Sequence, residues 1–298
     1  EAADEAGVLV QSELSYNCDE SSCETFAFDP VGDAKAIWEG YRRHPSFAVY
    51  SGGNEGTLGA AGKALFDWVH ANDPDRLVVE QDGGTYLEGH RADKSDFASG
   101  PMAMWERGSF NPRAFICHEY GNLAVKGDAR TEGDYTGVWL PRLTRAMRRE
   151  NLAAAGLGDA WGDRLQDAQH AFQRLWTVRS VEAARKDPFC DGYIFWTIVD
   201  VVVWNNAVKS YSAQGLFDPF WEAKPKGLTA ADFAKFNSPS CVLVDFEPAR
   251  RVFVSGETLK ANVQFAHYGD AGVVLCALFL GNYAGDCHAG TGFIVQFF

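Results

Sequence analysis

Basic residues are scarce in this sequence of 298 amino acids: 27 Lys and Arg stand against 40 Asp and Glu, a formal net charge of −13. This balance excludes a nucleic-acid binder that works through gross positive charge. Long apolar runs are also missing. The longest, residues 273–280, is far shorter than the roughly 20 residues that a membrane-spanning helix needs, so no membrane span is expected.

No CxxC pair occurs among the seven cysteines, so neither a zinc site nor a dense disulfide scaffold is indicated. Cys18 and Cys23 lie close together in a polar, acidic segment, where a local disulfide and two reduced thiols fit the sequence equally well. The sequence specifies no cofactor and no required metal ion. Because residue 1 is Glu rather than Met, we expect the true start upstream; the location is open, with a secreted or periplasmic protein as the working hypothesis.

Short apolar runs alternate with helical patterns up to about residue 236, which predicts βα units around a parallel sheet. Hydrophobic residues make up 46% of the chain, enough for one large folded core. The expected strands are residues 8–11, 47–50, 77–80, 103–105, 114–117 and 192–197, with helices at 34–43, 58–71 and 163–186.

In the last of these helices, apolar residues recur at helical spacing, with one polar exception, so this face is expected to pack on the sheet. The residues on it are Leu165, Ala168, Phe172, Leu175 and Arg179.

The sequence pattern changes after a linker at residues 227–240, which is rich in Gly, Ser and Pro. Short segments separated by turns follow, without a helical period, and predict a small antiparallel β domain. These segments are residues 242–246, 251–254, 259–266, 273–280 and 292–298. We therefore expect two domains, at residues 1–236 and 237–298.

Two expected strands end in a glutamate. Residues 44–55 read HPSFAVYSGGNE and present Asn54 and Glu55 after two glycines, and residues 114–122 read AFICHEYGN and present Glu119. In a βα barrel both would project from the face where active sites lie. Retaining glycoside hydrolysis needs one carboxylic acid to protonate the leaving oxygen and one carboxylate to attack. The alternative is that both glutamates complement helix dipoles.

These motifs resemble those of glycoside hydrolase family 2, the group of β-galactosidases, β-mannosidases and β-glucuronidases. HPSFAVYSGGNE is similar to its acid/base motif, HEYG to its nucleophile motif, and DGYIFW at residues 191–196 to its last barrel strand. Further matching segments are residues 7–10, 73–76, 215–218 and 225–226, so the resemblance covers most of the chain.

The resemblance implies an incomplete TIM (β/α)8 barrel of strands 3–8, followed by a small immunoglobulin-like β-sandwich. Residues 8–11 would form strand 3, so strands 1 and 2, the strand-2 arginine and the family's amino-terminal domains are not in this sequence. Six strands of eight leave two open edges, which puts independent activity in question.

The resemblance makes Glu55 the acid/base and Glu119 the nucleophile. Asn54 would bind the sugar 2-hydroxyl, Trp196 would form the floor of the subsite for the cleaved sugar, and Tyr120 would lie beside the nucleophile. The two carboxyl groups should be about 5–5.5 Å apart, and the pKa of Glu55 should lie above that of Glu119.

Other candidates come from the residues themselves. Asp82 and Asp200 each follow a strand and would bind sugar hydroxyls, or else remain solvated loop residues. Trp105, Trp204 and Trp221 would offer sugar-stacking surface or simply pack. His118 should point away from Glu119, toward the helices, because side chains alternate along a strand.

The predicted function is a retaining exo-β-glycosidase, similar to β-galactosidase, acting on terminal neutral sugars of oligosaccharides or glycoconjugates. HEYG continues as Asn122-Leu123-Ala124 rather than with an Ala-His pair, and no Asn-x-Lys element for glucuronides is evident. Three alternatives stay open: β-mannosidase or β-glucuronidase specificity, transglycosylation, and a non-catalytic carbohydrate-binding remnant. Self-association is also left open.

Overall fold

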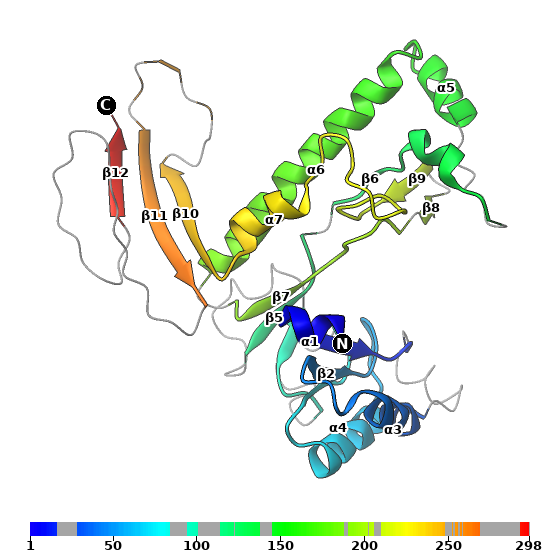
Figure 1. Cartoon of the computed structure of the whole chain (residues 1–298), viewed down its shortest axis with the longest axis vertical. Coiled ribbons are helices and arrows are strands. Elements are labelled where there is room, and N and C mark those ends of the chain that lie inside the picture. The colour runs from blue at the N-terminus through cyan, green and yellow to red at the C-terminus, as the bar shows by residue number, and fades with distance from the viewer. Residues whose placement is uncertain are drawn as a thin grey trace. The chain divides into compact units, whose positions relative to one another are not determined.

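The computed structural model describes fourteen segments of the chain, which form two compact units, Glu1–Asn122 with Pro188–Trp196 and Leu123–Asp187 with Thr197–Phe298 (Figure 1). The described residues are 1–16, 29–83, 94–100, 114–121, 123–137, 145–187, 190–201, 203–205, 210–247, 252, 254–255, 257, 259–268 and 293–297. Among them, no helix has the length and apolar character to cross a membrane.

Parallel strands dominate the first unit, as the sequence predicts. They form two three-stranded sheets, β1-β2-β3 and β4-β5-β7, in which each neighbouring pair is parallel. The strands are β1 (Val10–Glu13), β2 (Phe47–Ser51), β3 (Leu77–Val79), β4 (Ala98–Gly100), β5 (Phe115–Tyr120) and β7 (Gly192–Phe195). The expected strand at 103–105 lies outside the described residues.

The helix α1 (Ala2–Ala6) precedes the first sheet, and α3 (Pro30–Tyr41) and α4 (Ala60–Asn72) connect its strands. α3 begins where the sequence provides both start signals, because the carboxylate of Asp29 accepts a hydrogen bond from the Gly32 amide at 2.8 Å and Pro30 stands at the first helical position. The buried core between these helices and the sheet consists of Ala34, Phe47, Tyr50, Leu65, Val69 and Val78.

The matching segment at residues 73–76 has a structural role. The Tyr50 hydroxyl donates to Asp73 Oδ2 at 2.7 Å, and Arg76 Nη1 binds both oxygens of the same carboxylate at 2.6 and 2.9 Å. Arg76 Nε also donates to the carbonyl of Phe47 at 2.8 Å. The segment therefore joins the end of α4 to β2, and burial beside Asp73 raises the pKa of Tyr50.

The second unit is built from helices and two antiparallel sheets, β6-β9-β8 and β10-β11-β12. Its helices are η2 (Ala129–Asp134, a 3₁₀ helix), α5 (Arg145–Ala154), α6 (Trp161–Lys186) and α7 (Ala230–Asn237). Its strands are β6 (Val125–Lys126), β8 (Val203–Asn205), β9 (Ser210–Ala213), β10 (Ser240–Glu247), β11 (Leu259–His267) and β12 (Phe293–Phe297). Of the strands predicted after residue 240, those at 242–246, 259–266 and 292–298 are confirmed as antiparallel strands. Residues 252 and 254 of the predicted strand 251–254 are not in a strand, and residues 273–280 lie outside the described part.

The predicted packing face of α6 is wrong. Phe172 and Leu175 are each 57% exposed, and the face that is buried is largely polar. It consists of Gly162, Gln166, His170, Gln173, Thr177, Val181 and Ala184. The reason is that the carbonyl groups of Leu123, Lys126 and Gln214 lie against this face and accept hydrogen bonds from Gln166 and Gln173.

Among the cysteines of the described part, Cys117 and Cys241 are buried and Cys190 is half-buried. Cys18 and Cys23 lie outside it, so their pairing stays a prediction.

Candidate active site

The turn after β2 presents Glu55 because glycines let the backbone pass between two other segments. A Cβ on Gly53 would overlap the carbonyl oxygen of Tyr16, and this glycine has a φ of 148°. The turn is then held from both sides: the Asn54 amide donates to Tyr16 O at 2.9 Å, and the Glu55 amide donates to Asp82 O at 2.8 Å. The sequence GGNE therefore places Glu55 by backbone contacts.

Glu55 and Glu119 share an unusual backbone conformation. Their φ angles are 49° and 46°, in the left-handed region that residues other than glycine seldom adopt. Such a conformation costs on the order of 1–3 kcal/mol and is concentrated at functional sites. Both glutamates predicted from the sequence thus carry the same backbone strain.

His118 lies on the same side of β5 as Glu119, so the prediction that it faces the helices is wrong. The pairing of β5 with β7 shifts register between Cys117 and Tyr120, and the left-handed residue Glu119 lies within this interval. The regular alternation of side chains is broken there. The imidazole is buried, with its side chain 6% exposed, and a Cβ on Gly83 would overlap its Nδ1.

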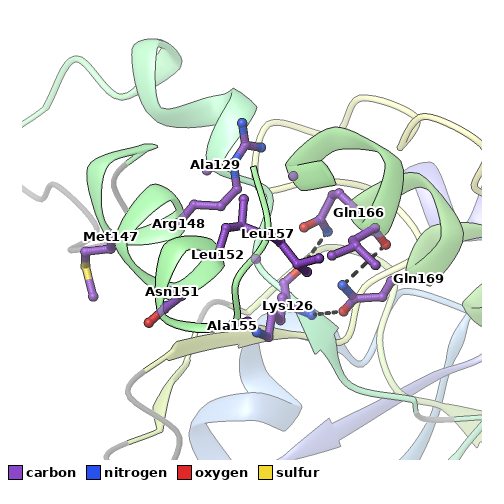
Figure 2. Close-up of a pocket in the computed structure, with 13 residues that line it drawn as sticks. Lys126, Ala129, Met147, Arg148, Asn151, Leu152, Ala155, Leu157, Gln166 and Gln169 are labelled. Carbon is purple, nitrogen blue, oxygen red and sulfur yellow. Dashed lines mark hydrogen bonds between the residues drawn. The ribbon is translucent and has the colours of Figure 1, made fainter. Parts of the chain in front are cut away.

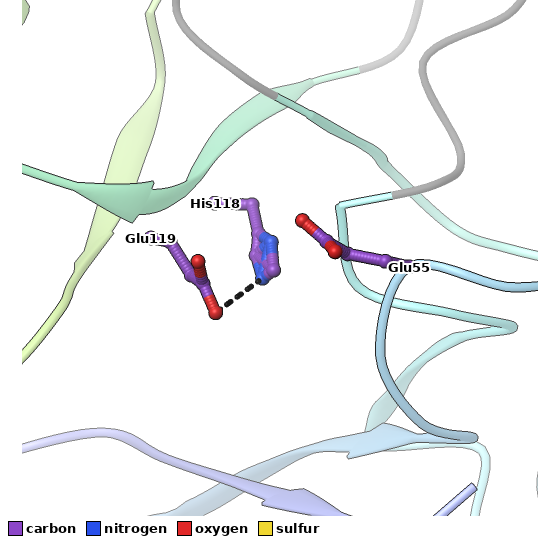
Figure 3. A group of neighbouring side chains, drawn as sticks. All are labelled: Glu55, His118 and Glu119. Carbon is purple, nitrogen blue, oxygen red and sulfur yellow. Dashed lines mark ion pairs between the residues drawn. The ribbon is translucent and has the colours of Figure 1, made fainter. Parts of the chain in front are cut away.

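Figure 3 shows the imidazole of His118 between the carboxylates of Glu55 and Glu119. His118 Nε2 lies 3.8 Å from Glu119 Oε1, and each of the three side chains offers an atom within 4.8 Å of the other two. Glu55 is exposed, whereas Glu119 is half-buried. Two carboxylates at this separation can act on opposite sides of one bond.

Burial raises the pKa of Glu119, and the negative charges of Glu55 and Asp82 raise it further, while His118 opposes them. The sequence leads us to expect the higher pKa on Glu55, because an attacking Glu119 must be ionised. The residues around Glu119 instead disfavour its ionisation.

Asp82 borders the site, but its carboxylate is already engaged by the protein. It is 2% exposed; Oδ2 accepts from Gln11 Nε2 at 2.7 Å, and Oδ1 accepts from the Gly83 amide at 2.9 Å and from the hydroxyl of Ser99. Since its carbonyl also receives the Glu55 amide, Asp82 supports the turn that presents Glu55.

The aromatic candidates are distributed over both units. Tyr120 is buried with its ring 5.6 Å from that of Tyr193, and the half-buried Trp196 donates its backbone N–H to Tyr120 O at 3.2 Å, beside the end of β5. Trp221 belongs to the second unit and is 68% exposed. Trp105 and the side chain of Trp204 lie outside the described part.

Known proteins resemble this chain in structure only: no protein-family model matches it, and no curated protein does. A candidate β-galactosidase from Bacteroides fragilis aligns with 88% of this chain and 38% of its own, at 14% identity and a TM-score of 0.51. The chain resembles this candidate β-galactosidase in fold.

Two further structures align at lower TM-scores. One is an FMN-binding β-glucuronidase from Facaelibacterium prausnitzii L2-6, with 14% identity over 89% of this chain and 40% of its own, at 0.43. The other is a glycosyl hydrolase family 2 member from Bacteroides cellulosilyticus, with 13% identity over 89% and 34%, at 0.45. The likeness in fold to the candidate β-galactosidase agrees with the family 2 resemblance expected from the motifs. This chain spans between 34% and 40% of these three solved structures.

Asp200 is not a solvated loop residue. It lies in the second unit, where its Oδ1 accepts from Lys224 Nζ and from the Gly215 amide, both at 2.7 Å. The side chains of Asp200 and Lys224 are 4% and 2% exposed. Because Asp200 and Lys224 both bind the backbone of Gly215, this buried ion pair holds the segment that includes the matching residues 215–218.

The second unit also contains a cavity of about 180 Å³ between α5 and α6 (Figure 2). Leu152, Leu157 and Leu165 give it an apolar lining, with Arg148 and Gln166 at its edge. Its described lining includes no Asp, Glu or His.

Sequence reasoning missed Glu13, which ends β1. Burial raises its pKa, and the negative charges of Asp82 and Glu119 add to the effect, so Glu13 belongs to the same electrostatic neighbourhood. The signal was present, because Glu13 is a strand-end carboxylate like Glu55 and Glu119. The predicted strand ended at residue 11, two positions too early.

Proposed function

We propose that this chain carries the catalytic carboxylates of a retaining exo-β-glycosidase that removes terminal neutral sugars by double displacement. The observation that supports this most is the pairing of Glu55 and Glu119 at the ends of parallel strands, with carboxylate oxygens within 4.8 Å of each other. Retaining glycosidases have carboxyl groups about 5–5.5 Å apart, and inverting ones about 6.5–9.5 Å.

In the first step, the Glu119 carboxylate attacks the anomeric carbon as the glycosidic C–O bond breaks, and Glu55 gives its proton to the departing oxygen. In the second step, Glu55 takes a proton from water, the water oxygen attacks the anomeric carbon, and the bond to Glu119 breaks. Glu55 suits this exchange because its exposed side chain can reach both the leaving group and incoming water. Asn54 would bind the 2-hydroxyl, and Tyr120, Trp196, Asp82 and Trp105 would shape the sugar subsite.

The charge of the pocket favours neutral sugars over glucuronides. The negative charges of Asp82 and Glu119 raise the pKa of Glu13, and those of Glu55 and Asp82 raise the pKa of Glu119, in each case after burial and against His118. An anionic sugar would meet this negative potential, so β-galactosidase-like specificity is the better fit.

For the domains, we propose that β1, β2, β3, β4, β5 and β7 are strands 3–8 of a (β/α)8 barrel at residues 1–236. Their parallel pairing in chain order supports this assignment. An immunoglobulin-like domain at residues 237–298 would include β10, β11 and β12, whose antiparallel pairing suits such a sandwich.

The test is covalent labelling of the purified chain. A 2-deoxy-2-fluoro-β-galactosyl fluoride should form a stable adduct at Glu119, located by peptide mass spectrometry, and the chain should hydrolyse aryl β-galactosides faster than aryl β-glucuronides. Glu119→Gln should prevent labelling. A chain that binds galactose but is neither labelled nor active would be the non-catalytic remnant, and this outcome would overturn the proposal.

A further inference from the structure

The side chains of Glu55, His118 and Glu119 present three potential metal ligands at one point of the pocket. Zn²⁺ holds nitrogen and oxygen ligands at about 2.0–2.2 Å, which places neighbouring ligand atoms about 3.3–3.6 Å apart in a tetrahedral site. The 3.8 Å between His118 Nε2 and Glu119 Oε1 is close to this spacing and too long for a hydrogen bond. Each of the three residues offers a ligand atom within 4.8 Å of those of the other two. Because Glu55 is exposed, a change of its rotamer can bring its carboxylate oxygen to the spacing of a metal site.

His118 separates this cluster from an ordinary group of surface carboxylates. Its side chain is 94% buried, Gly83 packs against its Nδ1, and its ring lies between the two carboxylates, with Nε2 toward Glu119 (Figure 3). Among the described residues, this imidazole lies at ion-pair distance from Glu119, and its charge also acts on Glu13. The ring is therefore fixed in place with a nitrogen directed into the pocket.

We propose that Glu55, His118 and Glu119 form a binding site for a single divalent transition-metal ion, represented by Zn²⁺, and that the bound ion inhibits the enzyme. Two carboxylates and an imidazole suit Zn²⁺, whereas Mg²⁺ prefers a shell of six oxygen ligands. The negative charge of Glu13 and Asp82 nearby favours a cation further.

Inhibition follows from the identity of the ligands, and this part rests on the proposed function. A Glu119 oxygen bound to the ion cannot attack the anomeric carbon, and a Glu55 bound to the ion holds no proton for the leaving group. Metal and substrate therefore compete for the same two carboxylates.

The test measures Zn²⁺ binding to the chain directly, against a chromophoric chelator, after alkylation of the thiols. We expect one Zn²⁺ per chain at a site that Mg²⁺ does not occupy, and at least about tenfold weaker binding in His118→Ala and in Glu55→Gln. His70→Ala is the matched control, since His70 Nε2 pairs with Asp96 at 3.0 Å outside the cluster and is 42% exposed. Its affinity should equal that of the unchanged chain.

The measurements distinguish failure of the metal site from failure of the proposed function. Unchanged Zn²⁺ affinity in both His118→Ala and Glu55→Gln, or no binding at all, would overturn the metal site; Glu55→Gln alters an exposed side chain and serves if His118→Ala does not fold. A chain that binds Zn²⁺ through these residues but hydrolyses no glycoside would overturn the proposed function instead. Full activity of the Zn²⁺-saturated chain would overturn the inhibition.

Discussion

Gly83 lies directly against the imidazole of His118: a Cβ at this position would overlap Nδ1 of the ring. Gly83 also has a φ of 72°, so its backbone and its packing both require glycine. Nε2 of the His118 ring lies 3.8 Å from Glu119 Oε1. The charge of His118 lowers the pKa of Glu119, against the carboxylates that raise it. A residue without a side chain thus determines where the imidazole stands.

Gly83→Ala should destabilise the chain and displace His118. The left-handed backbone alone costs about 1–2 kcal/mol for a non-glycine residue, and moving the buried ring adds to it. Gly7→Ala is the matched control, because Gly7 has a φ of 66° and no atom within 4 Å of its added Cβ. Urea unfolding should show a larger loss for Gly83→Ala. Equal losses would mean that the contact with His118 contributes nothing.

The two glutamates should respond differently to substitution. Glu119→Gln should abolish turnover of every glycoside, because no covalent intermediate can form. Glu55→Ala should spare the first step for substrates whose leaving groups need no protonation, and added azide should restore the second step as a glycosyl azide of retained configuration. Steady-state rates on aryl glycosides of graded leaving-group pKa measure both effects.

The reverse pattern would exchange the roles. It consists of azide rescue of Glu119→Ala with an inverted glycosyl azide, together with a Glu55→Ala variant whose rate is independent of the leaving group.

Stability should fall with pH below about 6.5 because of His170. Burial and the charge of Lys224 lower the pKa of His170, whose Nδ1 donates to Pro225 O at 3.0 Å while Nε2 accepts from Gln166 Nε2 at 2.9 Å. The neutral ring satisfies both contacts. Since the unfolded chain takes up this proton at the higher pH, the free energy of unfolding decreases as pH falls from 6.5 toward the folded pKa, by at most about 1.4 kcal/mol per pH unit.

Urea unfolding between pH 7.5 and 5.5 should therefore give a steeper pH dependence for the unchanged chain than for His170→Gln. His70→Gln, at a partly exposed position, should keep the steep dependence. A slope that persists in His170→Gln would assign the effect to other groups.

Local sequence signals were sufficient for the parallel strands and for Glu55 and Glu119, because strand ends, glycines and carboxylates can be read within about ten residues. The orientation of His118 could not be read in this way. It depends on a register shift between β5 and β7, which are about 70 positions apart in the chain, and on the left-handed conformation of Glu119. The dense contacts of Asp82 with Gln11 and Ser99 are likewise long-range.

The helix α6 shows the limit of hydrophobic periodicity. Its apolar spacing is real, but the polar residues opposite meet backbone carbonyls of irregular segments that no local pattern reveals. Gln173 Nε2 donates to Leu123 O at 2.9 Å and to Gln214 O at 3.2 Å, and Gln173 Oε1 accepts from the buried Lys224 at 3.2 Å.

On α6, replacing a buried polar residue should therefore reduce the free energy of unfolding more than replacing an exposed apolar one. Gln173→Ala removes the donor to Leu123 O and Gln214 O and one acceptor of Lys224 Nζ at a position that is 4% exposed, so it should cost about 2–3 kcal/mol. Phe172→Ala, at a position 57% exposed, should stay within about 0.5 kcal/mol, because little packing is lost and alanine favours the helix. The free energies of unfolding of the two variants, measured under one condition, decide between the faces. A larger loss for Phe172→Ala would mean that the apolar face of α6 is the buried one.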